Sequence, residues 1–210
     1  MIGFEKQVDE KIKDFYKKYF SKAAKEGKEV PLEYCINKAW ADATQRERFN
    51  GQQSEIIKNK DKIKNYLENQ IRDRMFSNNY DEWHRRMCSQ EEYLPYGIWQ
   101  KFINMTFKYM YCYRQCKDEK EFYDIKFEDC HCPIDRVITK RADTLCIVCG
   151  LKKSEIMTSI AESGENNWNN MNEEQYQEVR KKIREITEKC TINNSDTRHP
   201  TELEFDFLLW

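Results

Sequence analysis

Glycine and proline are scarce in this 210-residue chain, which contains only 6 glycines and 4 prolines. A fold built from β-strands needs many tight turns, and these two residues are the usual means of making them. Their scarcity therefore argues against an all-β protein. The chain also lacks any run of 18 apolar residues, so no transmembrane helix is expected. The first residues do not have the layout of a signal peptide, and we expect a soluble, cytoplasmic protein without a membrane partner.

An excess of positive charge is missing as well. The chain has 36 basic and 37 acidic residues, which gives a net charge of −1. Proteins that bind nucleic acids often carry a strong basic excess, so a DNA site on this chain would have to be a local patch or use backbone amides. Hydrophobic residues make up 39% of the chain and include 12 Tyr, 11 Phe and 5 Trp. This composition predicts a folded core rather than a disordered chain.

Helical periodicity dominates the rest of the sequence. Apolar residues recur every three or four positions, which predicts an all-α fold that forms a single domain over residues 1–210. The predicted helices span residues 4–26, 32–49, 54–76, 80–88, 98–113, 154–163 and 172–190. Residues 98–113 are apolar on nearly every side, as expected of a buried central helix. Residues 117–130 and 164–171 are predicted to be loops, and the apolar tail 203–210 is expected to dock on the core.

Two positions have the pattern of a capping box, in which a side chain at the start of a helix and another three residues later bond to the backbone. The first begins at Ser89 and predicts a short helix that ends near Pro95. The second begins at Asn172 and predicts the start of the last long helix.

The chain has nine cysteines and no recognisable secretion signal. This combination favours free thiols in a reducing compartment or a metal site. A C-x-C pair followed by a C-x-x-C pair could bind zinc through four sulfur atoms. The residues concerned are Cys130, Cys132, Cys146 and Cys149. Buried cysteines that act as small apolar side chains would explain the same pattern, and both interpretations stay open.

Two segments carry residues suited to chemistry. Residues 94–105 read as a proline- and glycine-containing hairpin followed by a buried helix, with Lys101 in its first turns. In residues 130–138, Asp135 follows Pro133 by two positions and leads into an apolar stretch. The hairpin consists of Leu94, Pro95, Tyr96 and Gly97.

These segments resemble the motifs of the helix-hairpin-helix DNA glycosylases, and the second is most similar to the Pro-Val-Asp motif of the 8-oxoguanine glycosylase branch. The motif core spans residues 89–141, although the hairpin has one glycine, Gly97, where the family usually has two. The resemblance implies an enzyme that removes a damaged or modified base from DNA, with an oxidised purine as the favoured substrate, and then nicks the strand. No cofactor is required for this chemistry.

The resemblance also implies roles for individual residues. Lys101 would be the nucleophile that attacks the sugar at C1′ and forms a Schiff base, and Asp135 would be its electrostatic and acid–base partner. The hairpin would hold the phosphate backbone of the DNA. The attacking amine must be neutral, and burial among aromatic side chains favours the neutral form. Each residue also has a plainer interpretation, because Lys101 could extend its amine to solvent and Asp135 could cap a helix.

A base flipped out of the DNA needs a pocket with an aromatic platform and polar groups. The candidates for this pocket are Trp83, Asn104, His131, Phe207 and Trp210. Packing in the core, or docking of the C-terminal tail, would account for the same residues.

Two other functions compete with the enzyme. The first is a catalytically silent DNA-binding or phage-defence-related protein of the same fold, which the near-neutral charge favours. The second is a helical protein–protein interaction module with a zinc staple.

Overall fold

The computed structural model describes residues 4–25, 32–45, 55–117, 122, 124–162, 167–190 and 198–210. All regular secondary structure within these ranges is helical, which confirms the predicted all-α fold. The α-helices are α1 (Phe4–Lys25), α2 (Leu32–Ala43), α3 (Glu55–Lys58), α4 (Lys60–Arg72), α5 (Tyr80–Cys88), α6 (Tyr96–Lys117), α7 (Arg136–Val148), α8 (Glu155–Glu162), α9 (Glu173–Cys190) and α10 (Glu202–Leu209). Two 3₁₀ turns are η2 (Phe127–Asp129) and η3 (Asn167–Asn170).

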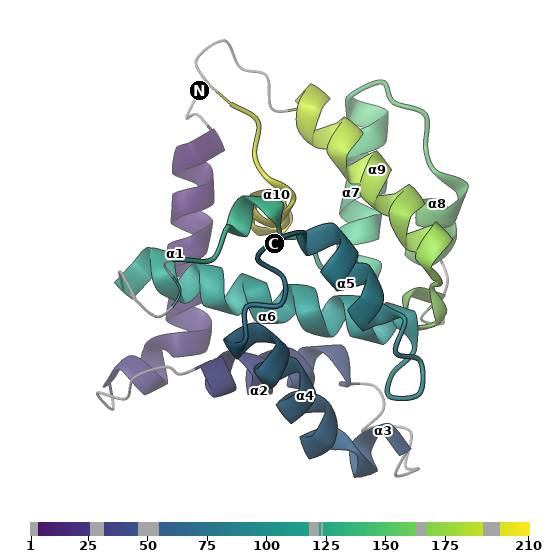
Figure 1. The fold of residues 1–210 in the computed structure, drawn as a ribbon. Coiled ribbons are helices and arrows are strands. Elements are labelled where there is room, and N and C mark those ends of the chain that lie inside the picture. Colours follow the sequence, from purple (N-terminus) through teal and green to yellow (C-terminus); the bar gives the residue numbers. More distant parts are fainter. Residues whose placement is uncertain are drawn as a thin grey trace.

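Helix α6 runs through the middle of the molecule with other helices around it (Figure 1). Its residues from Tyr96 to Tyr113 are all buried except Lys101, which is partly exposed. The prediction of a buried central helix is therefore confirmed, and the helix is longer than predicted at both ends. Because α6 is apolar on all sides, it can be covered only by packing neighbours against every face.

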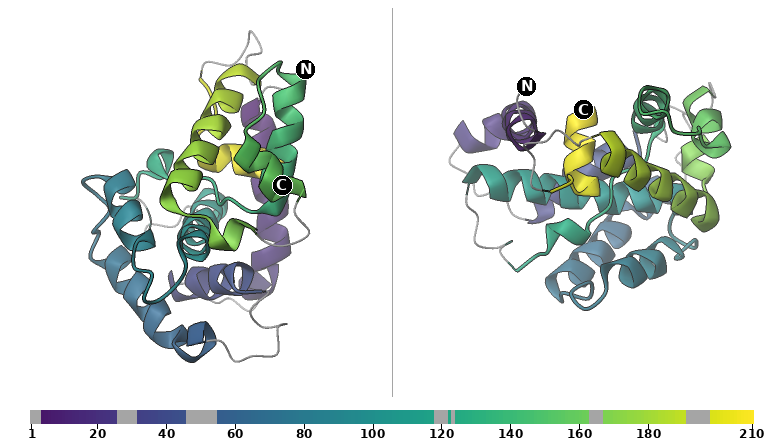
Figure 2. Two further views of the ribbon diagram at one scale, coloured as in Figure 1. Left: turned by 90° about the vertical axis from the view of Figure 1, so that its right-hand side faces the viewer. Right: turned by 90° about the horizontal axis from the view of Figure 1, so that it is seen from above.

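The remaining helices cover α6 from different directions. Helices α1, α2 and α5 and the turn η3 pack directly against it. Helices α7, α8 and α9 gather to one side of the molecule, and α10 lies between α1 and α9 (Figure 2). None of the described helices combines the length and the apolar character needed to cross a lipid bilayer.

Several predicted helix boundaries need correction. Helix α2 ends at Ala43, and residues 46–49 of the prediction lie outside the described part of the chain. The predicted helix 54–76 is divided at Asn59, which caps the start of α4, and α4 ends at Arg72. The loop predicted at 164–171 contains the turn η3 in its described part.

The two predicted capping boxes have opposite outcomes. Asn172 forms its box with Gln175, in which each side chain bonds to the backbone N–H of the other residue at 2.9 and 3.0 Å. Ser89 instead ends α5, and its hydroxyl donates to the carbonyl of Arg85 at 2.9 Å. The short helix predicted after Ser89 is therefore wrong, and turns replace it.

The apolar tail docks as predicted and forms the helix α10. Thr201 begins it with a complete capping box, since the Thr201 hydroxyl accepts from the N–H of Glu204 and the Glu204 carboxylate accepts from the N–H of Thr201. Leu203, Phe205, Phe207 and Leu209 are buried. Almost the whole of this short helix is thereby enclosed by protein.

Candidate functional site

The fold brings Lys101 and Asp135 together. The Lys101 Nζ atom lies 3.0 Å from the Asp135 Oδ2 atom, and the two side chains are 12% and 22% exposed. Lys101 comes from the second turn of α6, and Asp135 is the residue that caps the start of α7. The two residues are separated by 33 others in the sequence, so only the packing of the fold could establish this contact.

Asp135 uses its two carboxylate oxygens for different partners. Its Oδ1 atom accepts from the backbone N–H groups of Val137 and Ile138 at 2.9 and 3.0 Å, while Oδ2 faces Lys101. Burial alone would raise the pKa of Asp135, but Lys101 and the two backbone N–H groups outweigh burial and hold this pKa below its usual value. Asp135 thus caps α7 and also forms an ion pair with Lys101, while its catalytic role stays a prediction.

Two adjoining cavities meet at this ion pair. The first, which we call the aromatic cavity, measures about 300 Å³. Its walls include Phe15, Tyr19, Lys101, Met105, Lys108, Asp135, Arg141, Asp206 and Trp210. The second, which we call the Trp168 cavity, measures about 330 Å³ and is lined by Asp42, Ala43, Gln45, Lys101, Asp135, Arg136, Val137 and Trp168. Lys101 and Asp135 line both cavities.

A second lysine–aspartate pair lines the aromatic cavity. Lys108 Nζ lies 2.5 Å from Asp206 Oδ2, and their side chains are only 3% and 1% exposed. The Lys108 amine also lies 4.8 Å from the ring centres of Phe15 and Phe207. Burial raises the pKa of Asp206 in spite of the nearby lysine. This pair was not among the predicted site residues, although Lys108 follows Lys101 by seven positions and therefore shares its helix face.

The predicted hairpin has a different environment from the one expected. Leu94, Tyr96 and Gly97 are buried, and Pro95 alone is exposed. A Cβ atom at Gly97 would meet the main-chain carbonyl oxygens of Trp168 and Asn169 in η3. Carbonyl oxygens repel a phosphate, so this side of the hairpin is not open to a DNA backbone.

Of the five residues predicted for the base pocket, Trp210 lines the aromatic cavity. Phe207 lies behind it, fully buried against Phe15 and Lys108. Trp83, Asn104 and His131 line neither cavity. Trp83 packs instead against the rings of Phe76, Tyr80 and Phe107, and the two polar residues belong to the network described next.

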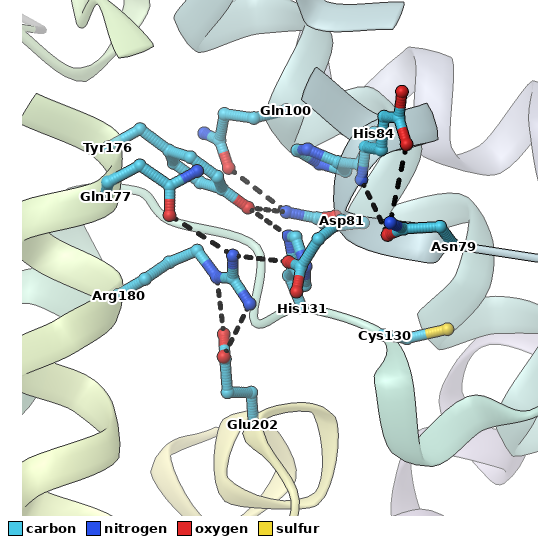
Figure 3. Close-up of polar contacts among 12 residues, drawn as sticks. Asn79, Asp81, His84, Gln100, Cys130, His131, Tyr176, Gln177, Arg180 and Glu202 are labelled. Carbon is cyan, nitrogen blue, oxygen red and sulfur yellow. Dashed lines mark hydrogen bonds and ion pairs between the residues drawn. The ribbon is translucent and has the colours of Figure 1, made fainter. Parts of the chain in front are cut away.

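Asn104 and His131 take part in a chain of buried hydrogen bonds between four segments (Figure 3). Asn104 donates to the hydroxyl of Tyr176 at 2.9 Å, and that hydroxyl is 2.9 Å from Nδ1 of His131. The Nε2 atom of His131 lies 2.7 Å from Asp81. This arrangement assigns the proton of the neutral imidazole to Nε2, which donates to the Asp81 carboxylate.

Arg180 completes the network and joins α9 to α5 and α10. It contacts Glu202 through two nitrogens, at 3.1 and 2.8 Å, and Asp81 through a third at 2.8 Å. Burial lowers the pKa of His131 to about 4. These contacts hold α5, α6, α9 and α10 together, and Asp81 and Glu202 also line a cavity of about 470 Å³ that does not include Lys101.

Three basic residues lie near the Lys101–Asp135 pair, although the net charge of the chain is only −1. Arg136, Lys140 and Arg141 follow Asp135 on the first turns of α7, and none forms an ion pair with a described carboxylate. Arg141 lines the aromatic cavity, and Arg136 lines the Trp168 cavity. The walls of the two cavities also carry the carboxylates of Asp42, Asp135 and Asp206.

The four cysteines of the zinc pattern do not form a common site. Cys130, Cys132 and Cys146 are buried free thiols. Cys149 is disulfide-bonded, which corrects the expectation of free thiols at this position and removes it as a zinc ligand. Among the described residues, no three His, Cys, Asp or Glu side chains are grouped so that they could hold a metal ion.

The cleft between α6, α7 and α10 therefore contains the strongest candidate for chemistry in the described structure. Comparison of this chain with protein family models, with curated proteins and with solved structures finds no match.

Proposed function

We propose that this protein is a DNA glycosylase with an associated strand-nicking lyase activity, and that its substrate is a damaged or modified base. The observation that carries the proposal is the Lys101–Asp135 pair, at 3.0 Å, placed where two cavities meet. An enzyme that acts at C1′ must take the nucleotide out of the base stack and receive it in a pocket. A lysine amine and a carboxylate that both face such a pocket are the groups this chemistry needs.

The reaction divides into two steps at Lys101. Lys101 first gives up a proton, and its neutral amine then forms a bond to C1′ as the bond from C1′ to the base breaks. The base leaves with the bonding electrons and takes up a proton. Opening of the sugar ring then gives a protonated Schiff base. Loss of a proton from C2′ and of the 3′ phosphate from C3′ breaks the strand. The carboxylate of Asp135 stabilises the positive charge that develops on the sugar as the base departs.

The aromatic cavity supports an oxidised purine as the substrate. Trp210 and Tyr19, which are both partly exposed, offer ring surfaces on which a base can stack, and Phe15 is buried behind them. Lys108 can donate a hydrogen bond and Asp206 can accept two, which matches the carbonyl and the adjacent N–H groups on one edge of a guanine ring. Lys101 and Lys108 lie two turns apart on one face of α6, and both line the aromatic cavity.

Borohydride trapping tests the proposal directly. The protein is mixed with duplex DNA that contains one abasic site, and borohydride reduces the Schiff base to a stable protein–DNA adduct. We expect the wild-type protein to give an adduct and Lys101→Ala to give none. Lys189→Ala, which removes an exposed lysine near the end of α9, is the matched control and should trap normally. A wild-type protein that gives no adduct, beside a glycosylase that does, would contradict the proposal.

Asp135→Asn separates the two roles of Asp135. Asparagine caps helices as well as aspartate does, so α7 should keep its start. Lys101 loses its ionic partner, so thermal unfolding is used to establish that the variant is folded. The negative charge beside the sugar is lost, and we expect base excision to fall on the order of 100-fold. An unchanged excision rate in a well-folded Asp135→Asn protein would show that the carboxylate has a structural role alone.

The double variant Lys108→Met/Asp206→Asn tests the base site. Removing both partners avoids leaving one buried charge unpaired. An abasic site has no base for these residues to contact, so trapping of abasic DNA should persist while excision of 8-oxoguanine is lost. Equal loss of both activities would overturn the assignment of this pair to the base.

The covered hairpin favours one alternative, a silent DNA-binding relative, because Gly97 is packed under η3. Such a protein would bind DNA in a salt-dependent manner without trapping it. The same trapping experiment, accompanied by a binding measurement, distinguishes the two functions.

A further inference from the structure

Trp168 lies against the candidate nucleophile. The Lys101 Nζ atom is 4.5 Å from the centre of the Trp168 ring, and it is 3.0 Å from Asp135. Trp168 is 5% exposed, yet it lines the cavity that Lys101 and Asp135 also line. No motif in the sequence indicated this residue, which follows Lys101 by 67 positions.

Gly97 is what allows Trp168 to reach this place. A Cβ atom at position 97 would lie 1.8 Å from the carbonyl oxygen of Trp168 and 2.7 Å from that of Asn169. Real Cβ atoms do not approach backbone oxygens so closely, so any other residue would push η3 away from the first turn of α6. Glycine at this position thus sets the distance between the indole ring and the amine one turn further along α6.

We propose that Trp168 is a positioning residue for Lys101, which holds the lysine nitrogen on its indole face before and during the lyase reaction. This inference rests on the proposed function. The face of an indole ring attracts a cation, and it does so most strongly when water is excluded. Two states of the Lys101 nitrogen are cationic: the ammonium of the free enzyme and the iminium of the Schiff base.

The indole stabilises both of these cations, so its effect on trapping comes from where it holds the nitrogen and not from a preference for one state. Overall, the Lys101 ammonium and the aldehyde of an open abasic sugar give a carbon–nitrogen bond, one water and an iminium, so one positive charge is present before and after the step. Borohydride then delivers hydride to the carbon and gives a neutral secondary amine. The nitrogen does not need to leave the ring face during these steps, because the sugar approaches from the cavity that Trp168 lines.

The test compares Trp168→Phe with Trp168→Leu. Phenylalanine keeps an aromatic face, whereas leucine is apolar but has no aromatic face. We expect Trp168→Leu to slow trapping of abasic DNA by about tenfold, the effect of one desolvated cation–π contact, and Trp168→Phe to stay within about threefold of wild type. Thermal unfolding of each variant establishes that it is folded. Trapping by Trp168→Leu at the wild-type rate, or an equal loss in both variants, would overturn the proposal.

Gly97→Ala is a second, independent variant, because it leaves the tryptophan in the chain and displaces η3. It should slow trapping as much as Trp168→Leu does. A Gly97→Ala protein that is folded and traps as wild type would contradict the link between Gly97 and the amine.

A measurement without DNA separates this inference from the proposed function. Protons on the face of an indole ring resonate upfield, so the Lys101 Cε methylene should show an upfield shift in wild type that disappears in Trp168→Leu and in Gly97→Ala. If the shift is present but wild type traps no DNA, the proposed function fails while the placement of the amine stands. If the shift is absent from wild type, the positioning role fails whatever the trapping result.

Discussion

Replacing Arg180 with methionine should destabilise the protein strongly, because Arg180 is the buried cation of the network in Figure 3. Its side chain is 3% exposed and contacts the carboxylates of Glu202 and Asp81. Glu202 is 9% exposed, so without Arg180 most of its charge stays out of water. Breaking a buried ion pair by removing one partner typically costs about 3–5 kcal/mol.

Two features of the site place the expected cost at the lower end of that range. Arg184 still contacts Glu202 at 2.6 Å, and Asp81 is 64% exposed and can be hydrated. We therefore expect Arg180→Met to lower the free energy of unfolding by about 3 kcal/mol. For a chain of this size that loss corresponds to a melting temperature roughly 6–12 °C lower.

Urea unfolding followed by circular dichroism provides the measurement. Arg184→Met is the matched control, because Arg184 is 52% exposed and its loss should cost less than about 1 kcal/mol. The double variant Arg180→Met/Glu202→Gln should recover most of the lost stability, since no unpaired charge remains at position 202. A loss below about 1 kcal/mol for Arg180→Met, or a double variant no better than the single one, would refute the reasoning.

Two further predictions concern acid and the C-terminal helix. Burial lowers the pKa of His131 to about 4 from an ordinary 6.5. Between pH 4 and pH 6.5, the histidine is therefore protonated in the unfolded chain and neutral in the folded one. The free energy of unfolding should therefore fall by about 3 kcal/mol as the pH drops from 6.5 to 4. Urea unfolding at pH 7 and at pH 4 measures this change. Equal stability at the two pH values would contradict the prediction. Thr201→Ala removes the cap of α10 and should cost about 1 kcal/mol, whereas Thr201→Ser should cost little. Chemical denaturation of the two variants compares them, and equal losses would show that the hydroxyl is not what matters.

Local sequence patterns were sufficient to predict the helical fold. The unbroken apolar character of residues 98–113 indicated a buried helix because no amphipathic helix has that pattern. The position of Asp135 before a helix indicated a cap, and the structure shows the cap. The boundaries were less accurate where one residue can either end a helix or begin the next, as at Ser89, whose hydroxyl donates to the carbonyl of Arg85 at the end of α5.

The candidate site could be predicted only in part, for a physical reason. Lys101 and Asp135 belong to short motifs, whereas the partner of Lys108 lies 98 positions further along the chain. Such a pairing depends on how helices pack, and no local pattern records it. Asn104 and His131 have the same hydrogen-bonding capacity in a buried network as in a ligand pocket, so residue type alone could not separate the two settings.

The two carboxylate oxygens of Asp135 bond to different partners, and this limits how the carboxylate can contact a ligand. Because Oδ1 already accepts from two N–H groups of α7, a ligand in the cleft can reach only Oδ2, which faces Lys101. A cationic group that takes the place of the lysine at Oδ2 breaks the Lys101–Asp135 ion pair. Arrival of such a ligand thus frees the Lys101 amine.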